Sequence, residues 1–182
     1  MEQRKPLVKL VDIKKEFPGV KALKGVSLEI LPGEVHGLVG ENGAGKSTLI
    51  KIMMGAYTAT SGEIFVDGVR QDIRNPQQAR ALGLGAVYQD VTLAPHLTVA
   101  ENFFLGCQPR KSGRVDWKTM YRSVQKTLDE LNIRVNAKAR INELTIGQQE
   151  MVTIAKVVYQ NAKVIVFDEP TALLANEEVQ LL

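Results

Sequence analysis

The sequence contains a single cysteine, Cys107, and this excludes an internal disulfide framework. Cys107 has no Cys or His neighbour at ligand spacing, which favours an inert thiol over a metal ligand or a nucleophile. No run of about 18 apolar residues occurs, so the sequence predicts no membrane-spanning helix. Charged residues interrupt the first ten positions and exclude a secretory signal peptide there. Any membrane-spanning part would have to come from another chain.

The sequence also lacks low-complexity tracts and Ser/Gly-rich linkers. Its 23 Lys and Arg against 20 Asp and Glu give a net charge of +3, and these cations are expected to be spread along the chain. Charge alone therefore gives little support to nucleic-acid binding. Hydrophobic residues make up 45% and charged residues 24%, as in an ordinary globular chain. A length of 182 residues accommodates one domain with a hydrophobic core rather than two.

Neither histidine has the spacing of a metal ligand, so packing or surface roles are favoured for His36 and His96. Trp117 is expected in local packing, with an interface anchor as the alternative.

Strand and helix patterns alternate along the chain. Strands are expected at residues 26–30, 35–39, 64–66, 86–88 and 164–167. Helices are expected at residues 47–54, from Asn75–Pro76, from the Thr98 capping box, at 118–131 and at 147–160. The continuous apolar run at 164–167 is expected to be buried on both faces. This alternation predicts an α/β domain with a largely parallel core sheet.

A glycine-rich loop follows the strand expected at 35–39. Residues 40–48 read GENGAGKST and fit the pattern G-x-x-x-x-G-K-[ST]. Glycines let the backbone approach a phosphate closely, and the N–H groups of the loop and the following helix supply partial positive charge. Lys46 is expected to reach the β- and γ-phosphates and Ser47 to ligate Mg²⁺. The expected binding residues are Gly40, Glu41, Asn42, Gly43, Ala44, Gly45, Lys46, Ser47 and Thr48; for Glu41 and Asn42 the alternative is only to shape the loop.

Two acidic residues follow the last expected strand. Ligands of open α/β sheets bind outside the carboxyl ends of the strands, where Asp168 lies. Adjacent residues at a strand end point differently, so Asp168 is expected in the Mg²⁺ shell while Glu169 polarises an attacking water. Alone, this pair would equally fit a solvated strand end.

Together these motifs make the chain resemble the nucleotide-binding subunits of ATP-binding cassette (ABC) transporters, and four further stretches carry the resemblance. Residues 144–149, LTIGQQ, resemble the family signature LSGGQ, and residues 164–171, VIVFDEPT, match the Walker B strand and its continuation. Gln89 falls where the family has its Q-loop glutamine. Phe17, ahead of residues 19–23 (GVKAL), resembles the A-loop aromatic that stacks on adenine.

The resemblance implies a P-loop NTPase fold with an N-terminal antiparallel β subdomain and a helical signature subdomain. It implies ATP and Mg²⁺ as ligands, with Phe17 and Gln89 in the ATP site, metal ligation by Ser47, Gln89 and Asp168, and catalysis by Glu169 and Lys46. It further implies a dimer in which the signature residues Thr145, Ile146, Gly147 and Gln148 contact an ATP held by a second ABC domain. The alternative for Thr145 is an ordinary helix N-cap.

Four stretches resemble the ATPases of ribose, galactose and xylose importers, and in particular the first of their two fused ABC domains. They are residues 35–48, residues 88–90, residues 97–106 and the signature residues 146–149. The resemblance implies a transmembrane permease as partner and, indirectly, an extracytoplasmic sugar-binding protein. It also implies a peripheral position on the cytoplasmic face of the membrane. No nucleic-acid partner is expected.

The chain departs from the family pattern at two places. Ala175 stands where the D-loop has an Asp, and Leu173 where a small residue is usual, which puts communication across a dimer in doubt. After Asp168 there is neither the strand nor the switch histidine that the family places beyond Walker B. The domain is therefore expected to be incomplete at its C-terminus, and unpaired backbone in the sheet centre would cost about 1–3 kcal/mol per group.

The resemblance divides residues 1–182 into three parts of one domain. A P-loop core with the β subdomain is expected at about 1–90, a helical signature region at 91–160, and the Walker B strand with the D-loop at 161–182. The expected function is ATP hydrolysis that drives sugar uptake through a permease. The alternatives are a truncated fragment or regulator that binds nucleotide without turnover, and a soluble ABC protein that is not a transporter.

Overall fold

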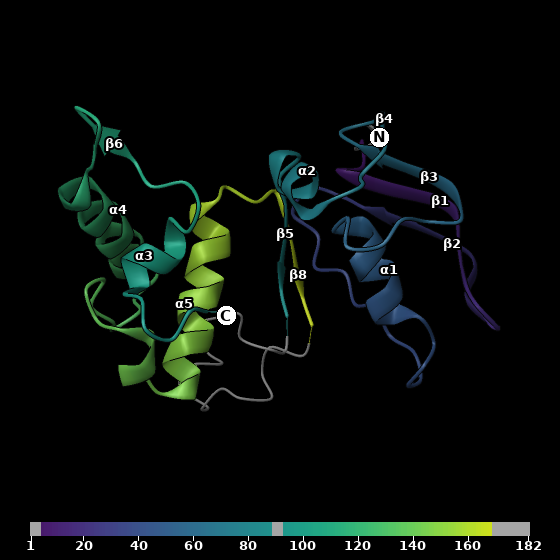
Figure 1. Ribbon diagram of the computed structural model, residues 1–182. Coiled ribbons are helices and arrows are strands. Elements are labelled where there is room, and N and C mark those ends of the chain that lie inside the picture. The colour runs from purple at the N-terminus through teal and green to yellow at the C-terminus, as the bar shows by residue number, and fades with distance from the viewer. Residues whose placement is uncertain (1–4, 89–92, 169–182) are drawn as a thin grey trace. The chain divides into compact units, whose positions relative to one another are not determined.

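The computed structural model of the chain describes residues 5–88 and 93–168. The chain divides into two compact units (Figure 1). The first comprises residues 1–86 and 162–166, and the second comprises residues 87–161 and 167–182. No helix among the described residues is long and apolar enough to cross a membrane.

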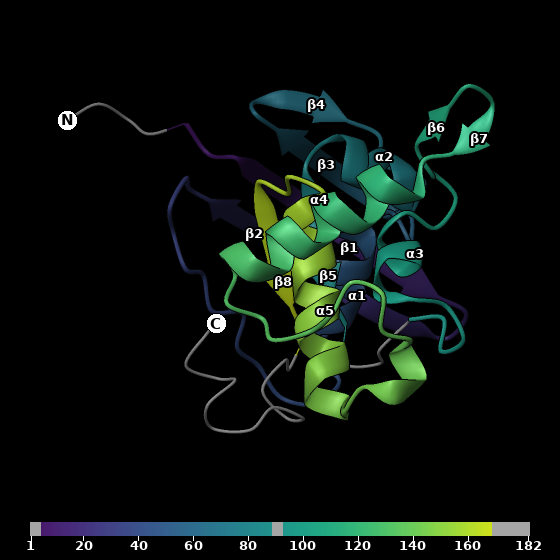
Figure 2. The ribbon, with the colours of Figure 1, turned by 90° about the vertical axis from the view of Figure 1, so that its left-hand side faces the viewer.

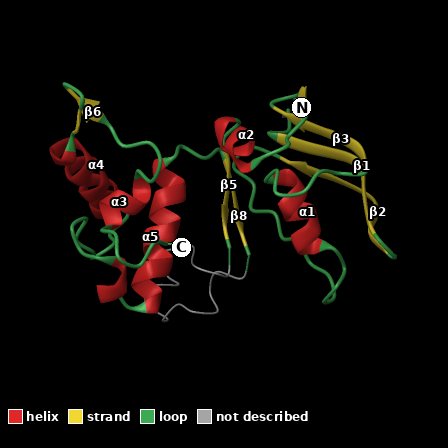
Figure 3. Cartoon of the chain, in the orientation of Figure 1, coloured by secondary structure: helices red, strands yellow, loops and turns green. Residues whose placement is uncertain are grey.

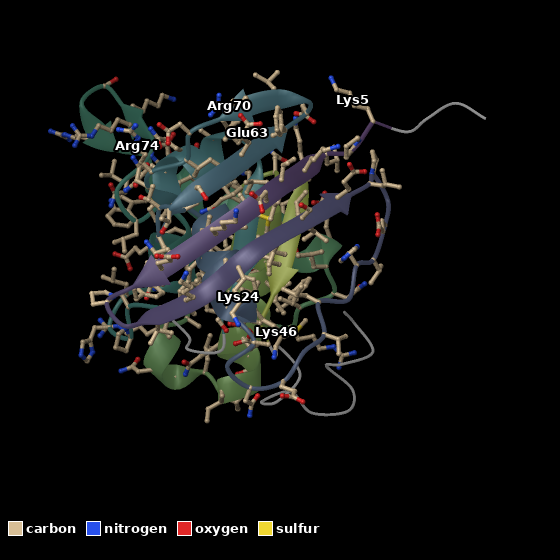
Figure 4. The ribbon with its side chains drawn as sticks, turned by 90° about the vertical axis from the view of Figure 1, so that its right-hand side faces the viewer. Lys5, Lys24, Lys46, Glu63, Arg70 and Arg74 are labelled. Atoms are coloured by element: carbon tan, nitrogen blue, oxygen red, sulfur yellow. The ribbon has the colours of Figure 1, made fainter. Side chains whose placement is uncertain are left out.

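A four-stranded antiparallel sheet forms the largest element of the first unit, and Figure 4 views it face on. Its strand order is β2-β1-β3-β4, with β1 at Val8–Phe17, β2 at Val20–Ile30, β3 at Ser61–Val66 and β4 at Val69–Gln71. The strands expected at 26–30 and 64–66 are confirmed. The antiparallel β subdomain implied by the family resemblance is this sheet.

Strand β1 was not expected from the sequence, because its alternation of apolar and polar residues breaks in the middle. Val8 and Leu10 are buried, and a bulge with a left-handed Asp12 (φ 48°) then makes Ile13 the next inward residue. The bulged Asp12 N–H is satisfied by the Ser27 hydroxyl of β2 at 3.0 Å. A period-2 pattern is therefore preserved in space but interrupted in sequence.

Two short helices belong to the first unit. Helix α1 (Lys46–Met53) lies against the sheet (Figure 1) and buries Leu49, Ile50, Ile52 and Met53. Helix α2 (Pro76–Ala81) begins as expected, with the Asn75 side chain accepting a hydrogen bond from the Gln78 N–H at 2.9 Å.

The parallel part of the fold consists, among the described residues, of two strands, β5 (Leu84–Val87) and β8 (Val164–Phe167). The N–H of Val164 donates to Gly83 O and the N–H of Asp168 to Val87 O, so the pairing advances in the same direction on both strands. The expectation that residues 164–167 are buried on both faces is wrong. Val164 is 8% exposed but Phe167 is 40% exposed.

The strand expected at residues 35–39 is not formed. Residues 34–41 have no regular secondary structure, and Val35 and Val39 are almost fully exposed, at 101% and 93%. An apolar run becomes a strand only where a neighbouring strand accepts its N–H and C=O groups, and none lies beside this run among the described residues. Its backbone groups remain in water, which avoids the penalty of burying them unpaired.

Helices dominate the second unit (Figure 3). They are α3 (Val99–Phe103), α4 (Trp117–Glu130), the short 3₁₀ helix η1 (Ile141–Glu143) and α5 (Ile146–Tyr159). A two-stranded hairpin, β6 (Arg110–Lys111) and β7 (Arg114–Val115), precedes α4. The predicted Thr98 capping box is present, with Glu101 Oε2 accepting from the Thr98 N–H at 2.8 Å. Buried Met120, Val124 and Leu128 confirm the apolar face predicted for α4.

Candidate functional site

The glycine-rich loop of the first unit has a backbone that only glycine can adopt at one position. Gly45 has φ 92°, and a Cβ there would lie 2.6 Å from Ala22 O and 2.7 Å from a methyl group of Leu23. Gly45 is also the N-cap of α1 and offers no side-chain acceptor to the first turn of that helix. The first-turn N–H groups therefore remain available to an external anion.

Lys46 closes the loop in this structure. Its ammonium donates to Gly40 O at 2.6 Å and to Glu41 O at 3.0 Å, and it is labelled in Figure 4. The N–H of Ala44 also donates to Glu41 O, at 3.1 Å. Ser47 is exposed in the first turn of α1. A cation, open N–H groups and a hydroxyl thus gather at one helix end, and this donor set fits a phosphate with an associated divalent cation.

An aromatic pair lies in the same unit. The ring of Phe17, the expected adenine-stacking residue, packs edge-on against the ring of Tyr57, with centroids 5.5 Å apart. Lys15 Nζ lies 5.0 Å from the Phe17 ring centre and Lys51 Nζ lies 5.5 Å from that of Tyr57. Sequence reasoning missed Tyr57, which lies just after α1 and is 38% exposed, because no motif marks it.

Asp168 directly follows β8 and is half-buried, in the second unit. Partial burial, and then the negative charge of Asp168, raise the pKa of the neighbouring Tyr88 hydroxyl. Gln89 and Glu169 lie outside the described residues. Ser47 belongs to the first unit and Asp168 to the second, so metal ligation by Ser47, Gln89 and Asp168 stays a prediction, as does catalysis by Glu169 and Lys46.

The signature residues begin helix α5. Thr145 is its N-cap, and its hydroxyl accepts from the Gln148 N–H at 3.2 Å while the Gln148 side chain accepts from the Thr145 N–H at 3.0 Å. The helix begins at Ile146, one residue before the expected start, and Ile146 is 60% exposed while Gly147 is buried. The alternative for Thr145, a helix N-cap, is therefore realised; its contact with a second ATP stays a prediction.

Helix α5 also buries a carboxyl group that sequence reasoning missed. Glu150 is 2% exposed, and neither side-chain oxygen has a hydrogen-bond partner among the described residues. Burial raises the pKa of Glu150 above its ordinary value. Its signal in the sequence is a charge between Gly147 and Met151 on the apolar face of the helix.

The remaining candidates are placed as follows. His36 Nδ1 lies 2.7 Å from Glu34 Oε1, in coil rather than in the expected strand, and Cys107 is exposed. The described residues contain no cluster of His, Cys, Asp or Glu that could hold a metal ion by itself. Leu173 and Ala175, the departures at the expected D-loop, lie outside the described residues.

Comparison with protein families places residues 23–172 within the family model described as "ABC transporter". Among curated proteins, the chain is 51% identical to Ribose import ATP-binding protein RbsA 1 of Rubrobacter xylanophilus over 98% of its own length and 36% of that protein. It is 47% identical to Ribose import ATP-binding protein RbsA 2 of Escherichia coli O157:H7, over 97% of the chain and 35% of that protein. The chain thus spans about a third of the length of these relatives.

The fold is similar to solved structures with the same architecture. One, an ATP-binding cassette of an ABC transporter, superposes with a TM-score of 0.82 at 28% identity, covering 96% of this chain and 73% of the other. Another, a dimeric cassette in a post-hydrolysis state bound to ADP and Pi, gives 0.78 at 27% identity, covering 96% and 78%.

Proposed function

The chain belongs to the ABC transporter family of ATP-binding proteins, and from this we propose that it binds and hydrolyses Mg-ATP to drive sugar uptake through a partner permease. The observation that carries the proposal is the loop around Gly45 and Lys46. There the backbone excludes any side chain, and the first turn of α1 lacks an internal cap. Both features suit a phosphate group better than they suit packing.

Each residue of the proposed site has a separate role. Lys46 exchanges its two carbonyl acceptors for phosphate oxygens when nucleotide enters, and its charge offsets the charge that develops during transfer. Phe17 and Tyr57 offer an aromatic surface to the adenine. Mg²⁺, when bound, would neutralise the charge of the phosphates. Ser47 and Asp168 supply oxygen ligands for it, and Glu169 orients the attacking water.

Sugar, and ribose as the first candidate, is proposed as the transported substrate because the similar curated proteins are named ribose import ATP-binding proteins. A second ABC domain as partner is supported by the dimeric cassette with ADP and Pi. In such a dimer, Thr145 and Gly147 at the N-terminus of α5 face the phosphate bound by the partner domain. The chain itself then sits peripherally, against a permease.

Calorimetric titration of the chain with Mg-ATP tests the proposal. Lys46→Ala is expected to weaken binding at least tenfold, because it removes the cation at the phosphates. Lys24→Ala is the matched control, because it removes an exposed lysine of strand β2. Figure 4 labels both Lys24 and Lys46. Equal binding by both variants, or no binding by the folded chain, would overturn the proposal.

A second candidate, nucleotide binding without turnover, is favoured by Ala175 at the D-loop position. Release of phosphate from ATP distinguishes the two. Turnover that is lost in Glu169→Gln, with ATP binding retained, supports a hydrolase. Tight binding with no phosphate release in the chain together with a permease supports the regulator.

A further inference from the structure

Positive charge is dense in one stretch of the second unit. Residues 110–122 carry five Lys and Arg and one carboxylate, Asp116, and so have a net charge of +4. The five cations, which with the residues between them we name the basic finger, are Arg110, Lys111, Arg114, Lys118 and Arg122.

The outer half of the basic finger is a preformed hairpin. Strands β6 and β7 pair Arg110 with Val115 and Lys111 with Arg114. Ser112 and Gly113 at the tip both have left-handed φ angles, 51° and 79°, as a two-residue hairpin turn requires. Figure 2 shows this hairpin projecting from the helices of its unit. Its cations are therefore held outward without the entropy cost of ordering a loose loop.

The single carboxylate of the finger does not neutralise it. Asp116 caps α4, and its two oxygens accept from the Thr119 N–H at 3.0 Å and the Thr119 hydroxyl at 2.7 Å. These hydrogen bonds, and then the nearby Lys111 and Arg122, hold the pKa of Asp116 below its ordinary value. Among the described residues, none of the five cations forms an ion pair with a carboxylate.

An exposed aromatic surface lies at the base of the hairpin. Trp117 is 46% exposed and stacks on Tyr121, with ring centroids 6.1 Å apart and planes 24° apart. Lys138 Nζ lies 5.5 Å from the centre of the Tyr121 ring, which adds a sixth cation. The indole thus packs locally on the Tyr121 ring, as expected from the sequence, and nearly half of it remains exposed. Amphipathic rings among cations are typical of surfaces that rest at the polar boundary of a membrane.

We propose that the basic finger binds the anionic headgroups of a phospholipid membrane. Each Lys or Arg close to such a surface strengthens binding by roughly fivefold, so the three cations of the hairpin and the two on α4 act together. A projecting hairpin with an indole at its base fits a broad, mobile layer of phosphates better than it fits a single acidic polymer chain. The surface uses none of the proposed nucleotide-binding residues, so it operates without ATP and stands or fails independently of ATP binding.

Trp117 makes the test direct, because it is the only tryptophan in the chain. Its emission is measured with vesicles of phosphatidylcholine alone and of phosphatidylcholine mixed with phosphatidylglycerol, without nucleotide. We expect a blue shift and co-sedimentation with the anionic vesicles only, both reversed by high salt. An unchanged emission with anionic vesicles, or an equal response to neutral vesicles, overturns the proposal.

Charge-reversal variants test whether the basic finger is the surface that binds the vesicles. Arg110→Glu/Lys111→Glu/Arg114→Glu is expected to weaken binding to anionic vesicles at least about a hundredfold. The matched control, Lys24→Glu/Arg80→Glu/Arg134→Glu, changes the net charge equally at exposed cations elsewhere and is expected to bind like the original chain. Circular dichroism checks that both variants fold. Equal losses in the two variants, or binding of polyglutamate or an oligonucleotide in preference to vesicles, would sink the proposal.

Discussion

Two glycines with similar backbone angles illustrate how single residues act in this chain. Gly33 has φ 73° with open space around it, whereas Gly45 has φ 92° with Ala22 and Leu23 at contact distance. An L residue pays about 1–2 kcal/mol for a left-handed angle at either position. Of these two positions, only Gly45 would also bring an added Cβ against a backbone atom, Ala22 O.

Gly45→Ala is therefore expected to abolish detectable Mg-ATP binding, and Gly33→Ala to retain it within about threefold. Gly33→Ala should lose roughly 1–2 kcal/mol of stability, and Gly45→Ala should lose more because of its clash with Ala22. Calorimetric titration and urea denaturation measure the two effects. Retained binding in Gly45→Ala would show that the loop geometry is not needed for the phosphate.

The protonation state of the Glu150 carboxyl group affects the stability of the fold. Because burial raises its pKa above 4.5, the folded chain holds this proton more tightly than the unfolded chain does. Its contribution to stability is therefore most favourable below the unfolded pKa and declines as the pH rises through the folded pKa. At neutral pH the folded state must bury a charge or bind a proton.

Glu150→Gln is expected to raise the free energy of unfolding at pH 7 by about 1–3 kcal/mol, with the gain vanishing near pH 4. Urea denaturation at the two pH values checks this. A gain of the same size at both would mean that packing, and not ionisation, separates the two side chains.

At the scale of the element, the sequence predicted structure best where the signal was local. Caps at Asn75 and Thr98 are local, and the helices α2 and α3 begin beside them. Strands depend on partners that a pattern does not contain. Residues 35–39 have the composition of a strand and no neighbour to pair with among the described residues, while β1 has a neighbour on both sides and a broken pattern.

The candidate site divides in the same way. The glycine-rich loop, Phe17, Asp168 and the α5 N-cap could be found in the sequence because each belongs to a contiguous motif. Tyr57 could not, because it owes its place to an edge contact with Phe17. Glu150 shows in the sequence only as a charge on the apolar face of α5, and its burial depends on how that face packs.

The substitution Val39→Ser tests whether residues 35–39 form a core strand or an exposed segment. We expect a change in the free energy of unfolding within about 0.5 kcal/mol, since the side chain is 93% exposed. Loss of about 1.5–3 kcal/mol, the value for a buried Val, would instead place residues 35–39 in a sheet in solution.

The start of α5 is expected to serve two purposes that can be separated. Thr145→Asp keeps an N-cap acceptor, so stability should match the original chain, whereas Thr145→Ala should lose about 1 kcal/mol. The aspartate also adds negative charge where a partner's phosphate is proposed to bind. ATP-dependent dimerisation, measured by analytical ultracentrifugation, should therefore fail in Thr145→Asp; an unimpaired dimer would exclude phosphate from this helix end.

At the scale of the whole molecule, the protection of backbone amides against hydrogen exchange should differ sharply between regions. Strand β1 is hydrogen-bonded on both sides, while all residues from Pro32 to Ala44 are exposed. Amide hydrogen exchange is expected to be slowest in β1 and fastest in residues 32–44, and Mg-ATP should slow exchange mainly at 40–48. Protection of 32–44 before nucleotide is added would contradict the open loop.

The pairing of β5 with β8 also bears on how the chain is made. The ribosome completes β5 at Val87 and must synthesise the entire helical unit before Val164 emerges as its partner. At about 5–20 residues per second, this interval lasts several seconds. During this interval the β2-β1-β3-β4 sheet already has all its strands. Strand β5, in contrast, still lacks its partner β8, so the backbone groups along that edge are unpaired. The newborn chain is thus most prone to misassociation between the synthesis of β5 and that of β8.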